Sequence, residues 1–379
     1  MGNMKDAAYP AARLAAPRVH AHFARRLAKA RERGLTPVAS LPDVGAIEAM
    51  VDSAFWASLR REEGYVPRVS LAFVSPQETA HPLLFERPLA LDPGALTRVA
   101  PAVERAGIHL GAWPRDNELI IWGTTQTIPA GGFVLEVAAP GLLVVKEHRR
   151  LTGKYVNIAV LEGDQVKMVG RHEAVDGPPL VASFLGLESP SAKDDAVNVL
   201  VQLAVSMRAH RRGGVLLFVP PATDAWRESI VQPISYGLAP PFSELALLVQ
   251  ETPGDERRRA WQDALERAVE AIAGLTAVDG ATVLTTDYDL LAFGAKIARR
   301  KGGTPVERVT LTEAIEDGGA ALLDPTQLGG TRHLSAAQFA HDQHEAVALV
   351  ASQDGRFTIF AWSTREAAVH AYRVEALLL

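Results

Sequence analysis

The chain has 379 residues, which is too many for one ordinary core and predicts two domains. Hydrophobic residues make up 48% and charged residues 22%, proportions that are typical of a water-soluble globular protein. The net charge of −5 provides no strong basic field for nucleic acid, and the absence of cysteine excludes disulfides and thiolate metal sites.

Membrane and export signals are not evident in the sequence. No stretch approaches the roughly 18 to 20 apolar residues that a helix needs to cross a bilayer. The N-terminal segment lacks the continuous apolar run of a secretory signal. We therefore expect a cytoplasmic protein that has no membrane partner and does not bind nucleic acid.

The first half has the pattern of an α+β domain, which we assign to residues 1–185. Helices are expected at residues 18–33 and 47–59, where apolar side chains recur at helical spacing. Short runs punctuated by Pro and Gly then predict strands at residues 69–74, 118–124, 132–137, 141–145, 155–161 and 165–169. His109 is expected to be an ordinary polar or core histidine.

The second half, residues 186–379, alternates helices with strands. A looser stretch at residues 171–192, rich in Pro, Gly and Ser, predicts the boundary between the two halves. Helices are expected at residues 194–209, 256–274 and 335–343. Strands are expected at residues 215–219, 282–285, 290–293, 346–352 and 356–362, the last two joined by the turn Gln353-Asp354-Gly355.

A first candidate site motif is Asp279-Gly280-Ala281, between a predicted helix and a predicted strand. The glycine allows a ligand to approach the backbone closely. The carboxylate of Asp279 suits a hard cation such as Mg²⁺, or a hydroxyl group that must lose its proton. Taken alone, Asp-Gly is more often an ordinary turn.

A second candidate motif runs from Gly329 through Gly330-Thr331-Arg332-His333-Leu334 to Ser335, just before a predicted helix. Glycine backbone and a helix N-terminus favour an anion, and an arginine can hold two phosphate oxygens at once. Histidine could donate a hydrogen bond to phosphate or bind a metal. Taken alone, this segment is more often a loop that caps a helix.

The two motifs gain weight from their order along the chain. They are accompanied by three further segments: Arg212-Gly213-Gly214 before a buried strand, Phe242-Ser243-Glu244-Leu245-Ala246, and Phe293-Gly294-Ala295-Lys296-Ile297. This succession resembles the diadenylate cyclase (DAC) domain over roughly residues 193–365. The resemblance implies an α/β fold with a mixed β-sheet flanked by helices, and an enzyme that condenses two ATP into cyclic di-AMP and two diphosphates.

The resemblance also implies roles for individual residues. Asp279 would bind Mg²⁺ or Mn²⁺ and activate the ribose 3′-hydroxyl, and Asp279, Arg332 and His333 would be the catalytic set. The implied ATP-binding residues are Gly280, Ala281, Phe293, Gly294, Ala295, Gly330, Thr331, Arg332, His333 and Ser335. Two ATP sites must face each other to close the product, so a homodimer or higher homo-oligomer is implied.

The chain departs from the family pattern at several positions. Leu334 stands where the family has a second arginine, and Ala340-His341 stands where many members have Ser-Glu. Arg299, Arg300 or Lys301 could replace the missing charge, although a solvated loop is the more ordinary reading of those three residues. The departures leave open a weak cyclase, a DAC-like module that binds ATP or cyclic di-AMP without turnover, and a purely structural or interaction module.

The N-terminal half carries a resemblance of its own. The segments 55–59, 107–113 and 140–146 resemble the region that precedes some DAC domains and is regarded as a probable sensor. This resemblance implies an unknown ligand or protein partner for the first domain.

Overall fold

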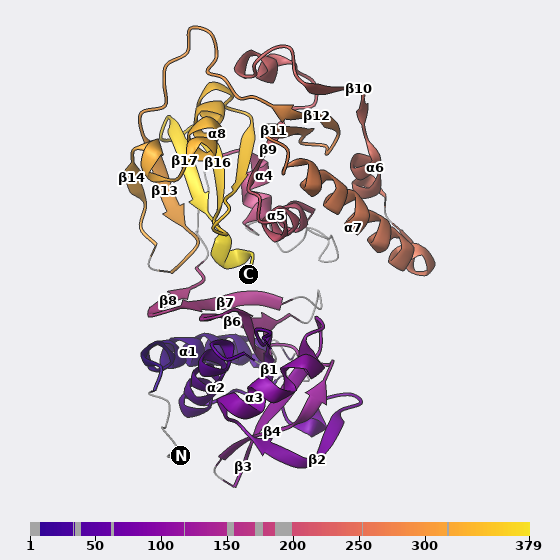
Figure 1. The fold of residues 1–379 in the computed structure, drawn as a ribbon, viewed down its shortest axis with the longest axis vertical. Coiled ribbons are helices and arrows are strands. Elements are labelled where there is room, and N and C mark those ends of the chain that lie inside the picture. The colour runs from indigo at the N-terminus through magenta and orange to yellow at the C-terminus, as the bar shows by residue number, and fades with distance from the viewer. Residues whose placement is uncertain are drawn as a thin grey trace. The chain divides into compact units, whose positions relative to one another are not determined.

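The structure, a computed structural model, describes residues 8–32, 34, 39–61, 64–116, 118–149, 155–170, 177–185, 199–251, 253–316 and 318–379. The chain divides into two compact units (Figure 1). Unit 1 comprises residues 1–170 with Leu379, and unit 2 comprises residues 171–378. Both units combine helices with a mixed sheet, so the predicted α/β class is confirmed. The residues that follow the predicted boundary, 186–198, lie outside the described part.

Unit 1 is an eight-stranded sheet with helices packed on it. The strands lie in the order β2-β4-β3-β1-β5-β6-β7-β8. Their bounds are β1 Ser70–Phe73, β2 Leu83–Ala90, β3 His109–Arg115, β4 Glu118–Thr125, β5 Phe133–Ala139, β6 Leu142–His148, β7 Tyr155–Glu162 and β8 Gln165–Met168. The helices are α1 Pro10–Glu32, α2 Val44–Ser58 and α3 Pro93–Val99. The core of unit 1 includes Phe23 of α1, Met50 of α2 and alternate residues of the strands.

Unit 2 has a nine-stranded sheet in the order β10-β12-β11-β9-β15-β16-β17-β13-β14. The strands are β9 Gly214–Val219, β10 Tyr236–Phe242, β11 Ala281–Thr285, β12 Leu290–Ala295, β13 Val309–Glu313, β14 Ala321–Leu323, β15 Val347–Ala351, β16 Phe357–Ser363 and β17 Ala368–Arg373. The helices are α4 Pro179–Phe184, α5 Val199–Ala209, α6 Glu244–Gln250, α7 Arg258–Leu275 and α8 Thr331–Asp342. The pairs β9–β11 and β13–β17 are parallel and the others antiparallel.

The two faces of the second sheet are covered by different helices. Leu216 and Phe218 of β9 pack with residues of α5 and α7, such as Leu203 and Ile272. Val215, Leu217 and Val219 point the other way and share a core with α8. A strand buried on both faces explains why β9 reads as a continuous apolar run. The result is three layers, with the sheet in the middle.

Several elements differ from the sequence prediction. Helix α1 begins at Pro10 instead of residue 18, with Pro17 inside it. Helix α8 begins at Thr331 instead of residue 335, so most of the second motif lies within its first turns. Strands β2, β3, β10, β13, β14 and β17 were not predicted.

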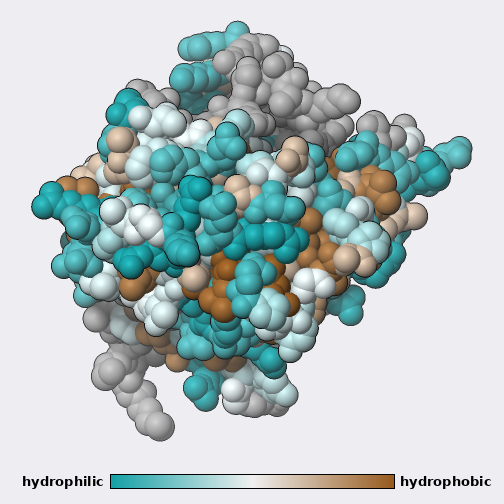
Figure 2. Space-filling model, turned by 90° about the horizontal axis from the view of Figure 1, so that it is seen from above, coloured by the Kyte–Doolittle hydropathy of each residue, from teal (hydrophilic) through white to brown (hydrophobic). Residues whose placement is uncertain are grey.

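The surface of the molecule mixes charged and apolar groups. The face in Figure 2 is mainly hydrophilic, with hydrophobic side chains exposed near its centre. Over the described ranges, no helix combines the length and hydropathy that a membrane crossing requires.

Candidate functional site

One end of the sheet of unit 2 brings the two sequence motifs together. The parallel strands β9 and β11 begin side by side, with Ala281 paired to Val215. Strand β15 runs antiparallel to β9 and ends at the same place, where Ala351 pairs with Gly214. The segments before β9 and β11 and after β15 therefore meet at one end of the sheet, which we call the motif end.

Arg332, in the first turn of α8, lies against the backbone that leads into β9. A Cβ atom on Gly213 would fall 2.6 Å from Arg332 Nη1 and 3.1 Å from the carbonyl oxygen of Ala351. Gly213 also has a φ of +69°, a conformation that other residues rarely adopt. Glycine at this position therefore lets the exposed Arg332 reach the motif end.

Asp279 presents an exposed carboxylate at the motif end. Its side chain is 88% exposed, and its Oδ2 accepts a hydrogen bond from Nζ of Lys296, which is 52% exposed. The hydrogen bond and the charge of Lys296, and also the charge of Arg332, hold the pKa of Asp279 below its usual value. The carboxylate is thus ionised at neutral pH and within electrostatic reach of two cations.

Two glycines approach each other beside Asp279. Ala281 of β11 pairs with Ala295 of β12. A Cβ atom on Gly280, whose φ is +115°, would lie 2.4 Å from the carbonyl carbon of Gly294. The backbones of Gly280 and Gly294 are therefore in direct contact next to the carboxylate.

An aromatic pair lies beside these glycines. The rings of Tyr236 and Phe293 are stacked, with centroids 4.7 Å apart and planes 8° apart. The Tyr236 ring also lies over Gly294, since a Cβ atom there would be 2.8 Å from Tyr236 Cδ2. Tyr236 is 50% exposed, so part of this pair is open to a ligand. A half-exposed aromatic ring is suited to stacking with a nucleobase.

The start of α8 adds a favourable site for negative charge. Gly330 is the N-cap residue, and no side chain caps the helix there. Thr331 is exposed and Ser335 is half-buried in the first turns. The positive end of the helix dipole therefore lies next to Arg332.

His333 does not share the exposure of its neighbours. The residue is 4% exposed, and its ring packs edge-on against Phe360 with centroids 6.1 Å apart. Within the described residues, His333 Nε2 is buried and has no hydrogen-bond partner. Burial, before any neighbouring charge, lowers the pKa of His333, so the ring is neutral at pH 7. In this conformation the ring contacts the core and not the surface around Arg332.

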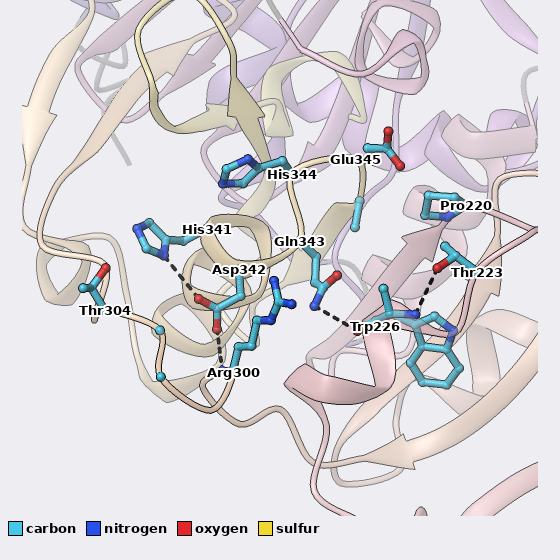
Figure 3. A pocket seen from close by; sticks show the side chains of 14 residues that line it. Pro220, Thr223, Trp226, Arg300, Thr304, His341, Asp342, Gln343, His344 and Glu345 are labelled. Atoms are coloured by element: carbon cyan, nitrogen blue, oxygen red, sulfur yellow. Dashed lines mark hydrogen bonds and ion pairs between the residues drawn. The ribbon is translucent and has the colours of Figure 1, made fainter.

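The other end of the sheet carries an open cavity of about 620 Å³ (Figure 3). It lies where β9 ends and β15 begins, beside the last turn of α8. Asp342 accepts hydrogen bonds from the backbone N–H of Arg300, at 2.8 Å, and from Gln338 Nε2, at 2.9 Å. The residues that line the cavity are Pro220, Thr223, Ala225, Trp226, Arg300, Gly302, Gly303, Thr304, His341, Asp342, Gln343, His344, Glu345 and Ala346.

This cavity is distinct from the motif end. A helix rises about 1.5 Å per residue, so the backbones of Arg332 and Asp342 are about 15 Å apart along α8. Arg300 lies at the cavity and its Nε is 2.6 Å from Glu228 Oε2. Arg300 therefore lies too far away to supply the positive charge that the DAC resemblance implies at position 334. His341 stands where the DAC resemblance implies a glutamate. It also lines the cavity and lies far from Asp279.

Two residues of the motif end had no role in the sequence prediction. Lys296 was noted only as part of a segment, and Tyr236 lies in a strand that was not predicted. A strand pattern could have identified Lys296, because Ala295 is buried and the next residue, at the strand end, is exposed. Tyr236 left no such signal, since Pro240 and Pro241 follow it and argue against a strand.

The protein side chains at the motif end do not form a metal site by themselves. In the part of the chain that the structure describes, no group of three or more His, Asp or Glu residues is arranged to hold a metal ion. Asp279 offers one exposed carboxylate. Mg²⁺ commonly binds through one or two carboxylates together with substrate phosphates and water. The residues present therefore fit a metal ion that arrives with nucleotide phosphates.

Comparison with known proteins bears on unit 1. Residues 36–126 match the family model described as "Probable sensor domain DACNV". Part of unit 1 is similar to a probable sensor domain. The predicted resemblance of the N-terminal half to a DAC-associated sensor region is thus confirmed for these residues, and the match does not extend into unit 2.

The other comparisons are less informative. No curated protein matches the chain. One similar solved structure is described as the hypothetical membrane spanning protein from Bacillus cereus, with 14% identity over 51% of this chain and 70% of that chain. Its TM-score of 0.28 is too low to indicate a shared fold.

Proposed function

We propose that unit 2 is a diadenylate cyclase domain, which condenses two ATP into cyclic di-AMP and two diphosphates. We propose further that the sensor domain in unit 1 regulates it. The main support is the meeting of Asp279, Arg332 and the packed glycines Gly280 and Gly294 at one end of the sheet. An exposed carboxylate beside two cations and a stacked aromatic pair suits a nucleoside triphosphate.

Each residue at the motif end would contact a different part of the ATP molecule. Arg332 and the start of α8 would hold phosphate oxygens. The exposed part of Tyr236 would stack on the adenine, above Gly294. Asp279 would lie near the ribose 3′-hydroxyl and accept a hydrogen bond from it. A bound Mg²⁺ or Mn²⁺ would be held by Asp279 and by phosphate oxygens, and would offset the charge that develops on the leaving diphosphate.

The reaction would require two subunits. The 3′-oxygen of each ATP would bond to the α-phosphorus of the other, the bond to the diphosphate oxygen would break, and the hydroxyl proton would leave to solvent. Positioning supplies most of the catalysis in such phosphoryl transfers. A symmetric homodimer places two sites face to face.

An exposed edge of the sheet supports the proposed dimer. Strand β10 is the edge strand beside β12, with Tyr236 toward the motif end and Phe242 opposite Leu290 at the other end of β12. These two residues are 50% and 45% exposed. Pro240 and Pro241 lack backbone N–H groups, which disfavours extension of the sheet by another strand. Contact between subunits would therefore be made by side chains.

A second candidate function is a DAC-like module that binds ATP or cyclic di-AMP without turnover. Leu334 favours it, because this apolar residue is 38% exposed where the family places an arginine. The burial of His333 removes another polar group from the phosphate site.

One experiment separates these functions. The full chain is incubated with ATP and Mg²⁺ or Mn²⁺, cyclic di-AMP is measured by mass spectrometry, and ATP binding is measured in parallel. The cyclase proposal predicts product that disappears in Asp279→Asn, which should keep its fold because the side chain is exposed. ATP binding without product would favour the second candidate. The absence of both would contradict both functions.

A further inference from the structure

Lys296 is the nearest cation to Asp279. It follows directly after β12, and its ammonium group donates to the Asp279 carboxylate. Both side chains are more than half exposed. Exposed ion pairs of this kind contribute little to stability, because water screens both charges. The ion pair can therefore separate easily, and Lys296 can bind another anion in place of Asp279.

Arg332 is a second cation at the motif end. Its guanidinium packs against Gly213, and its charge also acts on Asp279. The motif end therefore holds one carboxylate whose pKa is lowered by two cations. A triphosphate that entered here would meet Arg332 and could draw Lys296 away from Asp279, which would free the carboxylate for a metal ion or a hydroxyl group.

A further phosphate-binding charge does not come from Leu334, Arg300 or His210. Leu334 has no charge, and Arg300 lies at the opposite end of the sheet, paired with Glu228. His210, whose Nε2 is 3.1 Å from Thr276 Oγ1, has a pKa lowered first by burial and then by Arg212. His210 is thus neutral at pH 7.

We infer that Lys296 supplies the second phosphate-binding cation of this site, in the place of the arginine that Leu334 replaces. The inference rests on the proposed function, because it takes a nucleoside triphosphate as the ligand. Lysine acts as a point charge on a flexible stem, whereas arginine offers a rigid fork. A site that uses lysine should therefore hold the phosphates less rigidly.

The test compares ATP affinity across variants of the full chain. Lys296→Ala should weaken ATP binding by at least about 10-fold, as loss of a charged phosphate contact does. Lys296→Arg should stay within about 3-fold of the wild type, since it keeps the charge. Adding Leu334→Arg to Lys296→Ala should restore most of the affinity. Lys301→Ala, an exposed lysine in the loop of the other cavity, serves as the matched control and should bind normally.

Binding of inorganic diphosphate and of adenosine, measured separately, shows which part of ATP Lys296 contacts. Lys296→Ala should weaken the binding of inorganic diphosphate and leave the binding of adenosine unchanged. Because Lys296 is exposed, thermal melting should not change. If the wild type binds ATP and Lys296→Ala binds it as tightly, the assignment of Lys296 is overturned and the proposed function stands. If the wild type binds neither ATP nor diphosphate, the proposed function itself fails.

Discussion

The motif Gly329–Ser335 places Arg332 and His333 side by side, but the burial of His333 gives the two residues different roles. Arg332 and His333 are neighbours, yet one is exposed and the other is 4% exposed. A helix turns by about 100° per residue, so adjacent side chains on α8 face different surroundings. His333 therefore supports the shape of the site from the core, whereas Arg332 can contact a ligand directly.

This difference predicts opposite effects of two substitutions. Arg332→Ala should weaken ATP binding by about 10-fold or more with an unchanged melting temperature, because only an exposed charge is lost. His333→Leu should keep ATP affinity within about 3-fold and should not lower stability, since it removes an unpaired buried polar atom. Equilibrium binding and thermal melting provide the two readouts. A His333→Leu protein that is stable but loses ATP binding would show that the ring does contact the ligand.

His109 in unit 1 is a second buried histidine with a calculable consequence. It is 1% exposed, and its ring nitrogens lie 2.7 Å from Ser70 Oγ and 2.9 Å from the Tyr155 hydroxyl. Burial lowers its pKa to about 4, opposed by Glu136 and assisted by the charges of His148 and Lys146. The folded protein therefore keeps this ring neutral where the unfolded chain protonates it.

The stability of unit 1 should consequently fall in acid. The unfolded chain gains its proton near pH 6.5 and the folded chain near pH 4, so the contribution is complete above pH 6.5 and is lost as the pH falls to about 4. The loss from this one group is about 3 kcal/mol at most. Urea unfolding between pH 7 and 4, with hydrogen exchange of β3 to localise the event, measures it. His109→Gln should show a clearly smaller pH dependence, and an equal dependence would exclude His109 as the cause.

At the scale of elements, the close packing of the start of β11 on the end of β12 requires glycine at position 280. Gly280→Ala should destabilise unit 2 by about 2 kcal/mol or more, because a Cβ atom would clash with the backbone of Gly294 at a positive φ. Gly274→Ala is the matched control, since the exposed Gly274 lies near the end of α7 with nothing within 4 Å of a new Cβ atom. That change should stabilise by about 0.5 to 1 kcal/mol. Equal melting temperatures for the two variants would contradict this account.

The sequence predicted elements best where the local pattern and the packing agree. Strand β9 is buried on both faces and reads as a continuous apolar run, and α7 has a clear apolar stripe. Helix α1 begins eight residues before the predicted start, and the alanines of this added part, Ala11, Ala12, Ala15 and Ala16, are buried in the core. Edge strands such as β10 and β14 are mostly exposed and show no alternation of apolar and polar residues, so they could not be found.

The sequence could predict which residues belong to the candidate site better than it could predict how they are arranged. The order of motifs pointed to Asp279 and Arg332, and the strand register brings them to one end of the sheet. Sequence alone could not place His333 inside the core, because its burial depends on how α8 packs on β16. The ion pair of Lys296 with Asp279 joins residues on successive strands and likewise depends on the tertiary fold.

At the scale of the whole molecule, the proposed reaction couples activity to assembly. Two ATP-loaded sites must face each other, so activity per subunit should rise with protein concentration. Strand β10, the exposed edge strand beside β12, is the expected contact, and Phe242→Glu would place a charge on it. Leu322→Glu is the matched control, because Leu322 is 57% exposed on β14 at the opposite edge of the same sheet.

Phe242→Glu should raise the dimer dissociation constant by about 10-fold or more, since the new carboxylate would have to be desolvated in the contact. ATP binding to each subunit should be retained, and activity should recover at higher protein concentration. Sedimentation velocity and cyclic di-AMP production, measured over the same concentration series, give the two curves. Leu322→Glu should follow the wild type in both. Full activity of a strictly monomeric protein at nanomolar concentration would show that the second site is not supplied by another subunit, and an equal effect of the two variants would place the contact elsewhere.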